Sequence, residues 1–309
     1  MKIPVIMDCD PGHDDAIALI MALASERIDV RAVTTVGGNQ TSEKTLLNAL
    51  KILTFLGITH IPVAEGASQP LIRRLEIAPQ VHGETGLDGP ILPEPTFSAS
   101  PLSALALMEK VIKESDENIT LVPTGPLTNI AGLLTAAPWV KERINRISLM
   151  GGAAVGGNWT PAAEFNIMVD PEAADVVFNS GIPITMCGLD VTHRAEIFDH
   201  EIDKIRKMHK RVPVMVAELL DFFTHFHKEM GFLGSPLHDP CAVAWLIDPD
   251  LFSSKLLHVD IETCGEYTDG ATVVDIHGIT GRTPNADVVF DLDREGFIDL
   301  LMKSLQRYS

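Results

Sequence analysis

Short runs of apolar and β-branched residues recur along the first two thirds of the chain. They occupy residues 3–7, 30–36, 118–122, 146–150 and 182–186. Because each run ends in a loop rich in Gly, Pro or Asp, the runs predict buried β-strands. Stretches with apolar positions at helical spacing lie between them, at residues 14–25, 42–57, 126–137 and 171–181. This alternation is typical of βαβ units around a mostly parallel sheet.

The last third of the chain has a different pattern. Residues 200–248 are expected to be largely helical, and residues 256–263, 271–276 and 286–292 predict further strands before a last helix. In the helix predicted over 171–181, Pro171 lies near the first position and Gly181 is expected to close it. No repeat, low-complexity tract or linker divides the sequence. We therefore expect one domain over residues 1–309, an open, mostly parallel α/β sheet flanked by helices, with a helical insertion.

Charge and cysteine content narrow the possible partners and location. The formal net charge of −18 opposes binding to nucleic acid or to an anionic membrane surface, so a small neutral ligand is favoured. The four cysteines form no CxxC pair, which favours a reducing compartment. We find no basic segment followed by an apolar run at the N-terminus and no stretch of membrane-spanning length. A cytoplasmic protein is the expectation.

The first predicted strand leads into DCDPGHDD, residues 8–15, with four aspartates among eight residues. Helix capping and a favourable place in a first helical turn explain one or two of these carboxylates, not four. Clustered carboxylates repel one another unless a cation lies among them, and oxygen ligands favour a hard ion such as calcium or magnesium. An EF-hand loop beginning at Asp8 does not fit, because His13 and Leu19 stand where that loop needs Gly and Glu.

A phosphatase of the haloacid dehalogenase type is a competing interpretation of the same segment. There, Asp8 would be the nucleophile of a DxD motif at the end of a strand. The residues that follow fit less well, because Gly12 stands where that family expects Thr or Val.

Other polar loops also follow predicted strands. They are GGNQT at 37–41, PTGPLTN at 123–129 and the segment 150–166. Because parallel sheets bind ligands beyond the carboxyl ends of their strands, these loops are expected to meet at one site. The segment 235–245 adds His238 and Asp239 at the start of an apolar helix. The alternative for Asp239 is an acidic residue that only stabilises the first turn of the helix through the helix dipole.

Together these motifs resemble the inosine-uridine nucleoside hydrolase family. They are DCDPGHDD, GNQT at 38–41, HGETGLDGP at 82–90, PTGPLTN, GNWTPAAEFN at 157–166 and HDP at 238–240. HGETGLDGP and NWTPAAEFN look most similar to the bacterial pyrimidine-specific ribonucleoside hydrolases. The resemblance implies hydrolysis of the N-glycosidic bond of a ribonucleoside, with uridine and cytidine expected, to ribose and free base in nucleoside salvage or catabolism.

The resemblance also implies roles for single residues. One calcium ion per subunit would be held by Asp10, Asp15, Asp239 and the backbone carbonyl of Thr124. Asp14 would accept the proton of the attacking water, and Asp8 would orient a neighbouring ligand. The ribose would be bound by Asn39, Met150, Asn158, Glu164 and Asn166, with a solvated loop residue as the alternative for Glu164.

The base would lie on the other side of the pocket. His238 and His82 would assist its departure, although His82 could also be an ordinary surface histidine. Helical residues within 221–232 would cover the base, with Phe226, His227 and Met230 as candidates and plain core packing as the alternative. Pyrimidine preference is expected, with purine or mixed specificity as the alternative.

Two further points follow from the resemblance. It implies a homo-oligomer, a tetramer or a dimer. A non-catalytic, calcium-dependent nucleoside-binding protein is the alternative to an enzyme, and an assay of ribose release from nucleosides separates the two.

Overall fold

A sheet of eight strands forms the centre of the protein, of which the computed structural model describes residues 2–308. Its order is β3-β2-β1-β4-β5-β6-β12-β9. The bounds of these strands are β1 Ile3–Cys9, β2 Ile28–Thr35, β3 Val63–Glu65, β4 Ile119–Pro123, β5 Ile144–Met150, β6 Ile184–Cys187, β9 Phe252–Leu257 and β12 Ala286–Leu292. Neighbouring strands are parallel except β12 and β9. The predicted mostly parallel α/β sheet is confirmed.

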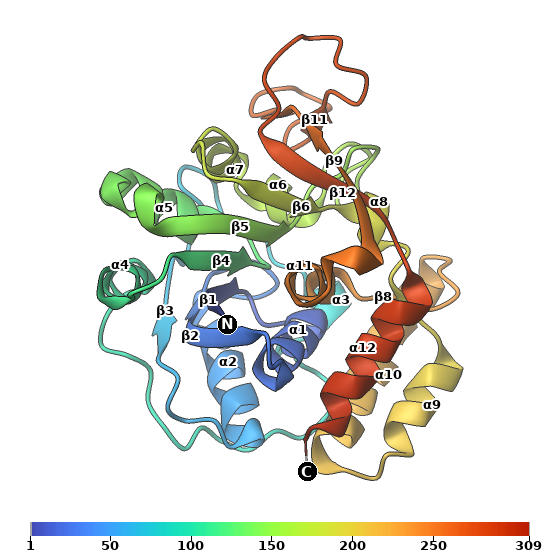
Figure 1. Ribbon diagram of the computed structural model, residues 1–309. Coiled ribbons are helices and arrows are strands. Elements are labelled where there is room, and N and C mark those ends of the chain that lie inside the picture. Colours follow the sequence, from blue (N-terminus) through green and yellow to red (C-terminus); the bar gives the residue numbers. More distant parts are fainter. Residues whose placement is uncertain (1, 309) are drawn as a thin grey trace.

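Helices flank this sheet (Figure 1). Their bounds are α1 His13–Ala24, α2 Ser42–Leu56, α3 Pro79–His82, α4 Ala104–Glu114, α5 Thr128–Ala136, α6 Phe165–Val169, α7 Pro171–Phe178, α8 Leu189–Thr192, α9 Asp199–Arg206, α10 Arg211–Glu229, α11 His238–Ile247 and α12 Arg294–Gln306. Short 3-10 turns are η1 Pro138–Arg143 and η2 Pro249–Leu251. Two small antiparallel pairs complete the structure, β7 Glu196–Ile197 with β8 Ser235–Pro236 and β10 Val259–Ile261 with β11 Thr272–Val274.

Alternate residues of β1 belong to two separate cores. Val5 and Met7 pack in the core that holds α1 and α11, whereas Ile6 packs in the core that holds α5 and α7. Successive side chains of a strand point to opposite faces, so a strand covered on both faces must be apolar throughout. This explains why the sequence of β1 is apolar at consecutive positions.

One helix end differs from the prediction. Helix α7 ends at Phe178 with Asn179 as its cap, so the expectation that Gly181 closes it is wrong. The side-chain amide of Asn179 donates to the carbonyl of Asp175 at 3.0 Å and satisfies the helix end. Gly181 instead has a φ of +80° in the turn before β6. The helices α9 and α10 form the predicted helical insertion.

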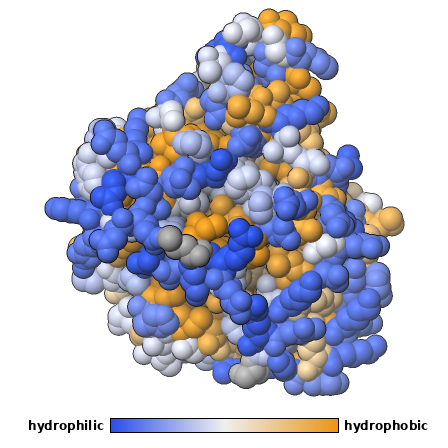
Figure 2. Space-filling view, viewed as in Figure 1, coloured by the Kyte–Doolittle hydropathy of each residue, from blue (hydrophilic) through white to orange (hydrophobic). Residues whose placement is uncertain are grey.

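The face of the molecule seen in Figure 2 is largely hydrophilic, and hydrophobic side chains appear on it in several places, among them the projection at its top. Tyr267 and Ile279, in the segments around β11, are more than four-fifths exposed. Within residues 2–308, no helix is both long enough and apolar enough to cross a membrane.

Candidate active site

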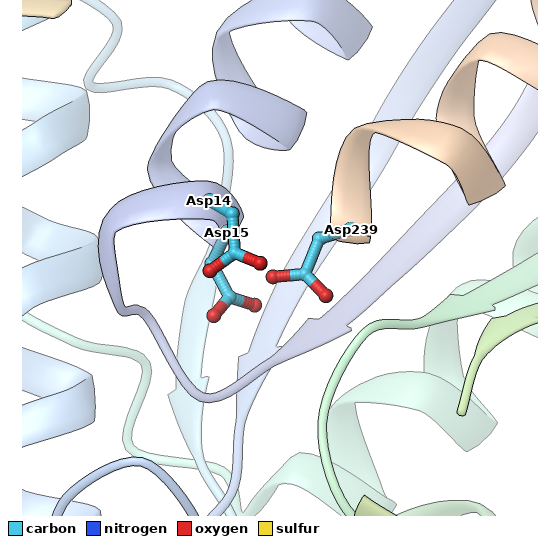
Figure 3. Close-up of side chains that lie close together, drawn as sticks. All are labelled: Asp14, Asp15 and Asp239. Carbon is cyan, nitrogen blue, oxygen red and sulfur yellow. The ribbon is translucent and has the colours of Figure 1, made fainter. Parts of the chain in front are cut away.

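Three carboxylates meet where β1 leads into α1. Asp14 and Asp15 lie in the first turn of α1, and Asp239 is the second residue of α11. Each offers an oxygen within 4.8 Å of the others, and Figure 3 shows the three groups pointing toward one another. The three residues are brought together because α1 and α11 begin next to each other, as Figure 3 shows. The segment 8–15 and the start of the helix predicted after residue 235 therefore meet at one place.

Asp15 is held by three donors. Its Oδ2 accepts from the backbone N–H of Gly12 at 3.0 Å and from the side chain of Asn39 at 3.2 Å. Its Oδ1 accepts from the hydroxyl of Thr124 at 2.7 Å. A carboxylate with this many donors keeps one orientation, which a metal ligand requires.

Asp10 has one satisfied oxygen and one without a partner. Its Oδ2 accepts from the backbone N–H of Asn39 at 2.7 Å. Its Oδ1 is buried and has no hydrogen-bond partner among the described residues. A Cβ at Gly125 would lie 2.5 Å from this Oδ1, so glycine is needed for so close an approach. Because a buried, unpaired carboxylate oxygen is costly, the site fits a cation.

The raised pKa values of the clustered carboxylates also indicate a site that fits a cation. Burial, followed by repulsion from Asp15, raises the pKa of Asp14 to about 7. Burial also raises the pKa of Asp15 to about 6, and it raises the pKa values of Asp10 and Asp239 well above their ordinary range. Buried like charges must be neutralised by protons or by a metal ion. Carboxylate and carbonyl oxygens suit a hard cation.

The closest triad contains Asp14 and not Asp10. The sequence-based assignment made Asp10 a ligand and Asp14 the base. A carboxylate beside a metal site can serve either as a ligand or as a base, and Asp14 is the one of these two that also lines the cavity.

Asp8 lies apart from the pocket. It is buried in β1, where its Oδ1 accepts from the Thr34 hydroxyl at 2.6 Å and from the Asn129 side chain at 2.8 Å. It is not among the described residues that line the cavity. A nucleophile must reach its substrate, so this position opposes the phosphatase interpretation.

A cavity of about 440 Å³ opens beside the cluster. Most of the predicted site residues line it, namely Asp14, Asn39, His82, Thr124, Met150, Asn158, Glu164, Asn166, Phe226, His227, Met230, His238 and Asp239. Asp10 and Asp15 are not lining residues and lie behind its wall.

Glu164 is not a solvated loop residue. Its side chain caps α6 by accepting from the backbone N–H groups of Asn166 at 3.0 Å and Ile167 at 3.2 Å, and it also accepts from Gly152 at 2.8 Å. Burial raises its pKa to about 7 despite these donors. Its helix-capping role therefore coexists with its place in the cavity wall.

The predicted amides are also hydrogen-bonded to the protein. The side chain of Asn166 donates to the carbonyl of Thr124 at 2.8 Å, and the Oδ1 of Asn158 accepts from Phe165 at 3.0 Å. Asn39 donates to the carbonyl of Asp10 at 3.2 Å as well as to Asp15. Within residues 2–308, three atoms of these amides accept or donate no hydrogen bond and remain for a ligand, Asn39 Oδ1, Asn158 Nδ2 and Asn166 Oδ1.

The histidines form the other side of the cavity. His82 is the last residue of α3 and is only 5% exposed, so it is not an ordinary surface histidine. His238 begins α11, and its Nδ1 lies 2.8 Å from the hydroxyl of Thr192. Of the two histidines of the HFH segment at 225–227, His225 is exposed and His227 is buried.

Several residues of this side were missed by sequence reasoning. His193, Phe223, Phe232 and Trp159 line the cavity, and His13 stacks between His82 and Phe222 behind it. His13 lies inside the motif DCDPGHDD, so its position was a signal. Trp159 lies inside the motif GNWTPAAEFN, and Phe223 and Phe232 lie inside the segment 221–232, so for these residues the segment was predicted but not the residue. Only His193 lies outside every segment singled out in the sequence.

Comparison with known proteins decides the family. A sequence model described as inosine-uridine preferring nucleoside hydrolase matches residues 5–299. The chain belongs to this family. As a ribonucleoside hydrolase, it has an acidic cluster that fits the family's dependence on a metal ion.

Its relatives cover the whole chain. The pyrimidine-specific ribonucleoside hydrolase RihA of Photobacterium profundum is 61% identical over 100% of both chains. That of Escherichia coli O1:K1 / APEC is 56% identical, again over 100% of both. A purine-preferring ribonucleoside hydrolase from Gardnerella vaginalis superimposes with a TM-score of 0.92 at 32% identity, covering 98% of each chain. The hydrolase therefore has relatives of either base preference.

Proposed function

We propose that this hydrolase cleaves the N-glycosidic bond of uridine and cytidine, releasing ribose and the free base, with one calcium ion per subunit. The observation that carries the proposal is a single cavity with carboxylates on one side and histidines on the other. The names of the two relatives at 61% and 56% identity support pyrimidines over the purine preference of the structure at 32%.

The proposed metal ligands are oxygen atoms only. Asp10, Asp15, Asp239 and the carbonyl of Thr124 would hold the ion, and this set suits calcium better than zinc, which recruits Cys or His. The unpartnered Oδ1 of Asp10 supports its place in the set. When bound, such an ion orients a water molecule and lowers its pKa.

Asp14 is the proposed general base. It lines the cavity, and its pKa, raised to about 7 by burial, matches proton transfer near neutral pH. The carbonyl and side-chain oxygens around it would stabilise the positive charge that develops on the ribose. Asn39, Met150, Asn158, Glu164 and Asn166 would bind the sugar.

His238 and His82 would assist the departing base. Each imidazole has its Nδ1 engaged by the protein and its Nε2 free of protein partners within residues 2–308. A positioned general acid contributes roughly 10²- to 10⁴-fold to a rate. Phe226 and His227 would contact the base.

We also propose that the chain forms one cytoplasmic domain and assembles into a homotetramer or homodimer. The exposed apolar side chains of Tyr267 and Ile279 support assembly, because large apolar groups on a surface favour burial against a partner. Light scattering of the purified protein tests this.

The test of the activity is direct. Purified protein is incubated with uridine, cytidine or inosine, with added calcium or with a chelator, and reducing sugar is measured. We expect release from the two pyrimidine nucleosides, lost on chelation. Binding without release would favour the non-catalytic alternative, and faster release from inosine would contradict the base preference.

A further inference from the structure

The loop that follows β5 carries no polar side chain. It spans residues 151–157, with the sequence GGAAVGG, and lies between Met150 and Asn158. None of its side chains can form a hydrogen bond. Gly152 has a φ of +74°, a conformation that glycine adopts readily and other residues do not. Contacts from other elements must therefore hold this glycine-rich loop in place.

Thr272, the first residue of β11, supplies several of these contacts. Its hydroxyl oxygen accepts from the backbone N–H of Ala153 at 2.8 Å and donates to the carbonyl of the same residue at 2.5 Å. Its methyl group lies against the preceding residue, because a Cβ at Gly152 would be 2.7 Å from the Cγ2 of Thr272. Thr272 is only 7% exposed, so water has little access to these groups. A further contact comes from α8, where the N–H of Leu189 donates to the carbonyl of Gly152 at 2.9 Å.

The loop held in this way donates to Glu164. The backbone N–H of Gly152 lies 2.8 Å from the Oε2 of Glu164. The other two donors to this carboxylate, the N–H groups of Asn166 and Ile167, belong to α6, which Glu164 caps. A carboxylate with donors from two different elements is fixed more firmly than one held by its own helix alone. The place of the loop therefore affects the orientation of Glu164.

The hairpin of β10 and β11 also contacts α6. Gly270, close before β11, has a φ of +77°, and a Cβ there would lie 2.7 Å from the Cα of Met168 in α6. Val259 and Ile261 of β10 are buried in the core that holds α5 and α7, which makes the hairpin a fixed support. The same hairpin thus touches both elements that donate to Glu164.

We propose that Thr272 is a positioning residue for sugar binding, which holds the glycine-rich loop so that Gly152 orients the carboxylate of Glu164. Thr272 is not among the described residues that line the cavity, so it acts through the loop. The inference rests on the proposed function for the contact between Glu164 and the ribose. It does not depend on the base, because the sugar is the same in every ribonucleoside.

A double-mutant cycle with T272V and E164Q tests this role. T272V keeps the size and branching of the side chain and removes only the hydroxyl, whereas T272S keeps the hydroxyl. We expect T272V to lower kcat/KM about tenfold, mainly through a higher KM, because a sugar contact is misplaced. T272S should stay within about threefold of the native value. In the E164Q background T272V should change kcat/KM by less than about twofold, because the two residues act through one contact.

Stability and metal content are measured beside the kinetics. T268V is the matched control, since it makes the same change at an exposed position of the same hairpin and should keep native kinetics. If Thr272 only stabilises the fold, T272V lowers kcat by the same factor in both backgrounds and leaves KM unchanged, and this additive result overturns the proposal. An equal loss in T272S and T272V also overturns it. T272A, which removes the hydroxyl without adding a methyl group, completes the cycle if T272V does not fold.

The choice of substrate separates this inference from the proposed base preference. The cycle is measured with uridine and with inosine, which carry the same ribose. If the native protein hydrolyses inosine and not uridine, the proposed preference fails, while the cycle on inosine still decides the role of Thr272. Isothermal titration of the calcium-loaded variants with free ribose needs no turnover, and we expect about tenfold weaker binding in T272V and no further loss in the double variant. Native ribose affinity in T272V means that Thr272 does not position the sugar site.

Discussion

The hydroxyl of Thr124 donates a 2.7 Å hydrogen bond to the carboxylate of Asp15. This contact joins the loop after β4 to the first turn of α1 across 109 positions of sequence. Thr124 also offers the carbonyl proposed as a metal ligand, and that carbonyl accepts from Asn166 at 2.8 Å. A single residue therefore orients one ligand with its side chain and supplies another with its backbone.

Removing only the hydroxyl tests this dual role. We expect T124V to bind calcium about 10- to 100-fold more weakly, because Asp15 loses a donor that fixes its orientation. T124S keeps the hydroxyl and should stay within about threefold of the native affinity. Calcium affinity is measured by isothermal titration, with circular dichroism to verify the fold. Equal affinities for T124V and T124S would show that this hydrogen bond does not position the ligand.

Asp10 is expected to be indispensable for the metal but not for the fold. The variant D10N should lose stoichiometric calcium and nearly all activity, because its buried Oδ1 is the oxygen without a protein partner. The metal-free variant should be at least as stable as metal-free native protein, since an amide relieves repulsion among buried carboxylates. Elemental analysis and thermal unfolding measure the two effects. Native calcium content in D10N would remove Asp10 from the ligand set.

Asp14 is expected to act on the reaction and not on the metal. D14N should keep calcium and substrate binding and lose at least about 10³-fold in kcat, because an amide cannot accept the proton of the water. Metal content, KM and kcat are measured together. Since Asp14 belongs to the closest carboxylate triad, loss of calcium in D14N would identify it as a ligand and contradict its assignment as the base.

Metal affinity should depend on pH. Without a cation the pKa values of Asp14 and Asp15 are about 7 and about 6, above the ordinary value of 3.8, so protons occupy the cluster below these values. Calcium must displace these protons, so affinity should rise with pH by about tenfold per unit for each proton released.

Titrations at about pH 5.5 and about pH 7.5 measure this dependence. Counting protons released into two buffers of different ionisation enthalpy provides the control. An affinity that is the same at both values would mean that the carboxylates are already ionised in the metal-free protein.

Much of the fold and many site residues were readable from the sequence because their signals are local. The apolar run of β1 and the position of Asp239 at the start of α11 follow from patterns of a few residues. The partners of Asp8 do not, because Thr34 and Asn129 lie 26 and 121 positions away. The end of α7 was misplaced because Asn179 caps the helix before Gly181 is reached. A single sequence does not determine which distant residues come into contact in the fold. It also does not determine which of two nearby residues caps the end of a helix.

The last prediction concerns the departure of the base. His238 lines the cavity and has its Nδ1 2.8 Å from the hydroxyl of Thr192, which leaves Nε2 for the ligand. A pyrimidine leaves with negative charge that must be neutralised, whereas a nitrophenyl leaving group needs no proton. We therefore expect H238A to slow uridine hydrolysis by roughly 10²- to 10⁴-fold and hydrolysis of nitrophenyl riboside far less. H82A should show the same pattern more weakly.

Comparing the two substrates separates proton donation from shaping of the site. KM for uridine should change little in H238A, because the proposed metal and ribose contacts remain. T192V provides a matched variant that keeps His238 but removes the hydroxyl beside its Nδ1, and it should show a smaller loss confined to uridine. Equal losses on both substrates in H238A would mean that His238 shapes the cavity, and its assignment as the general acid would then be wrong.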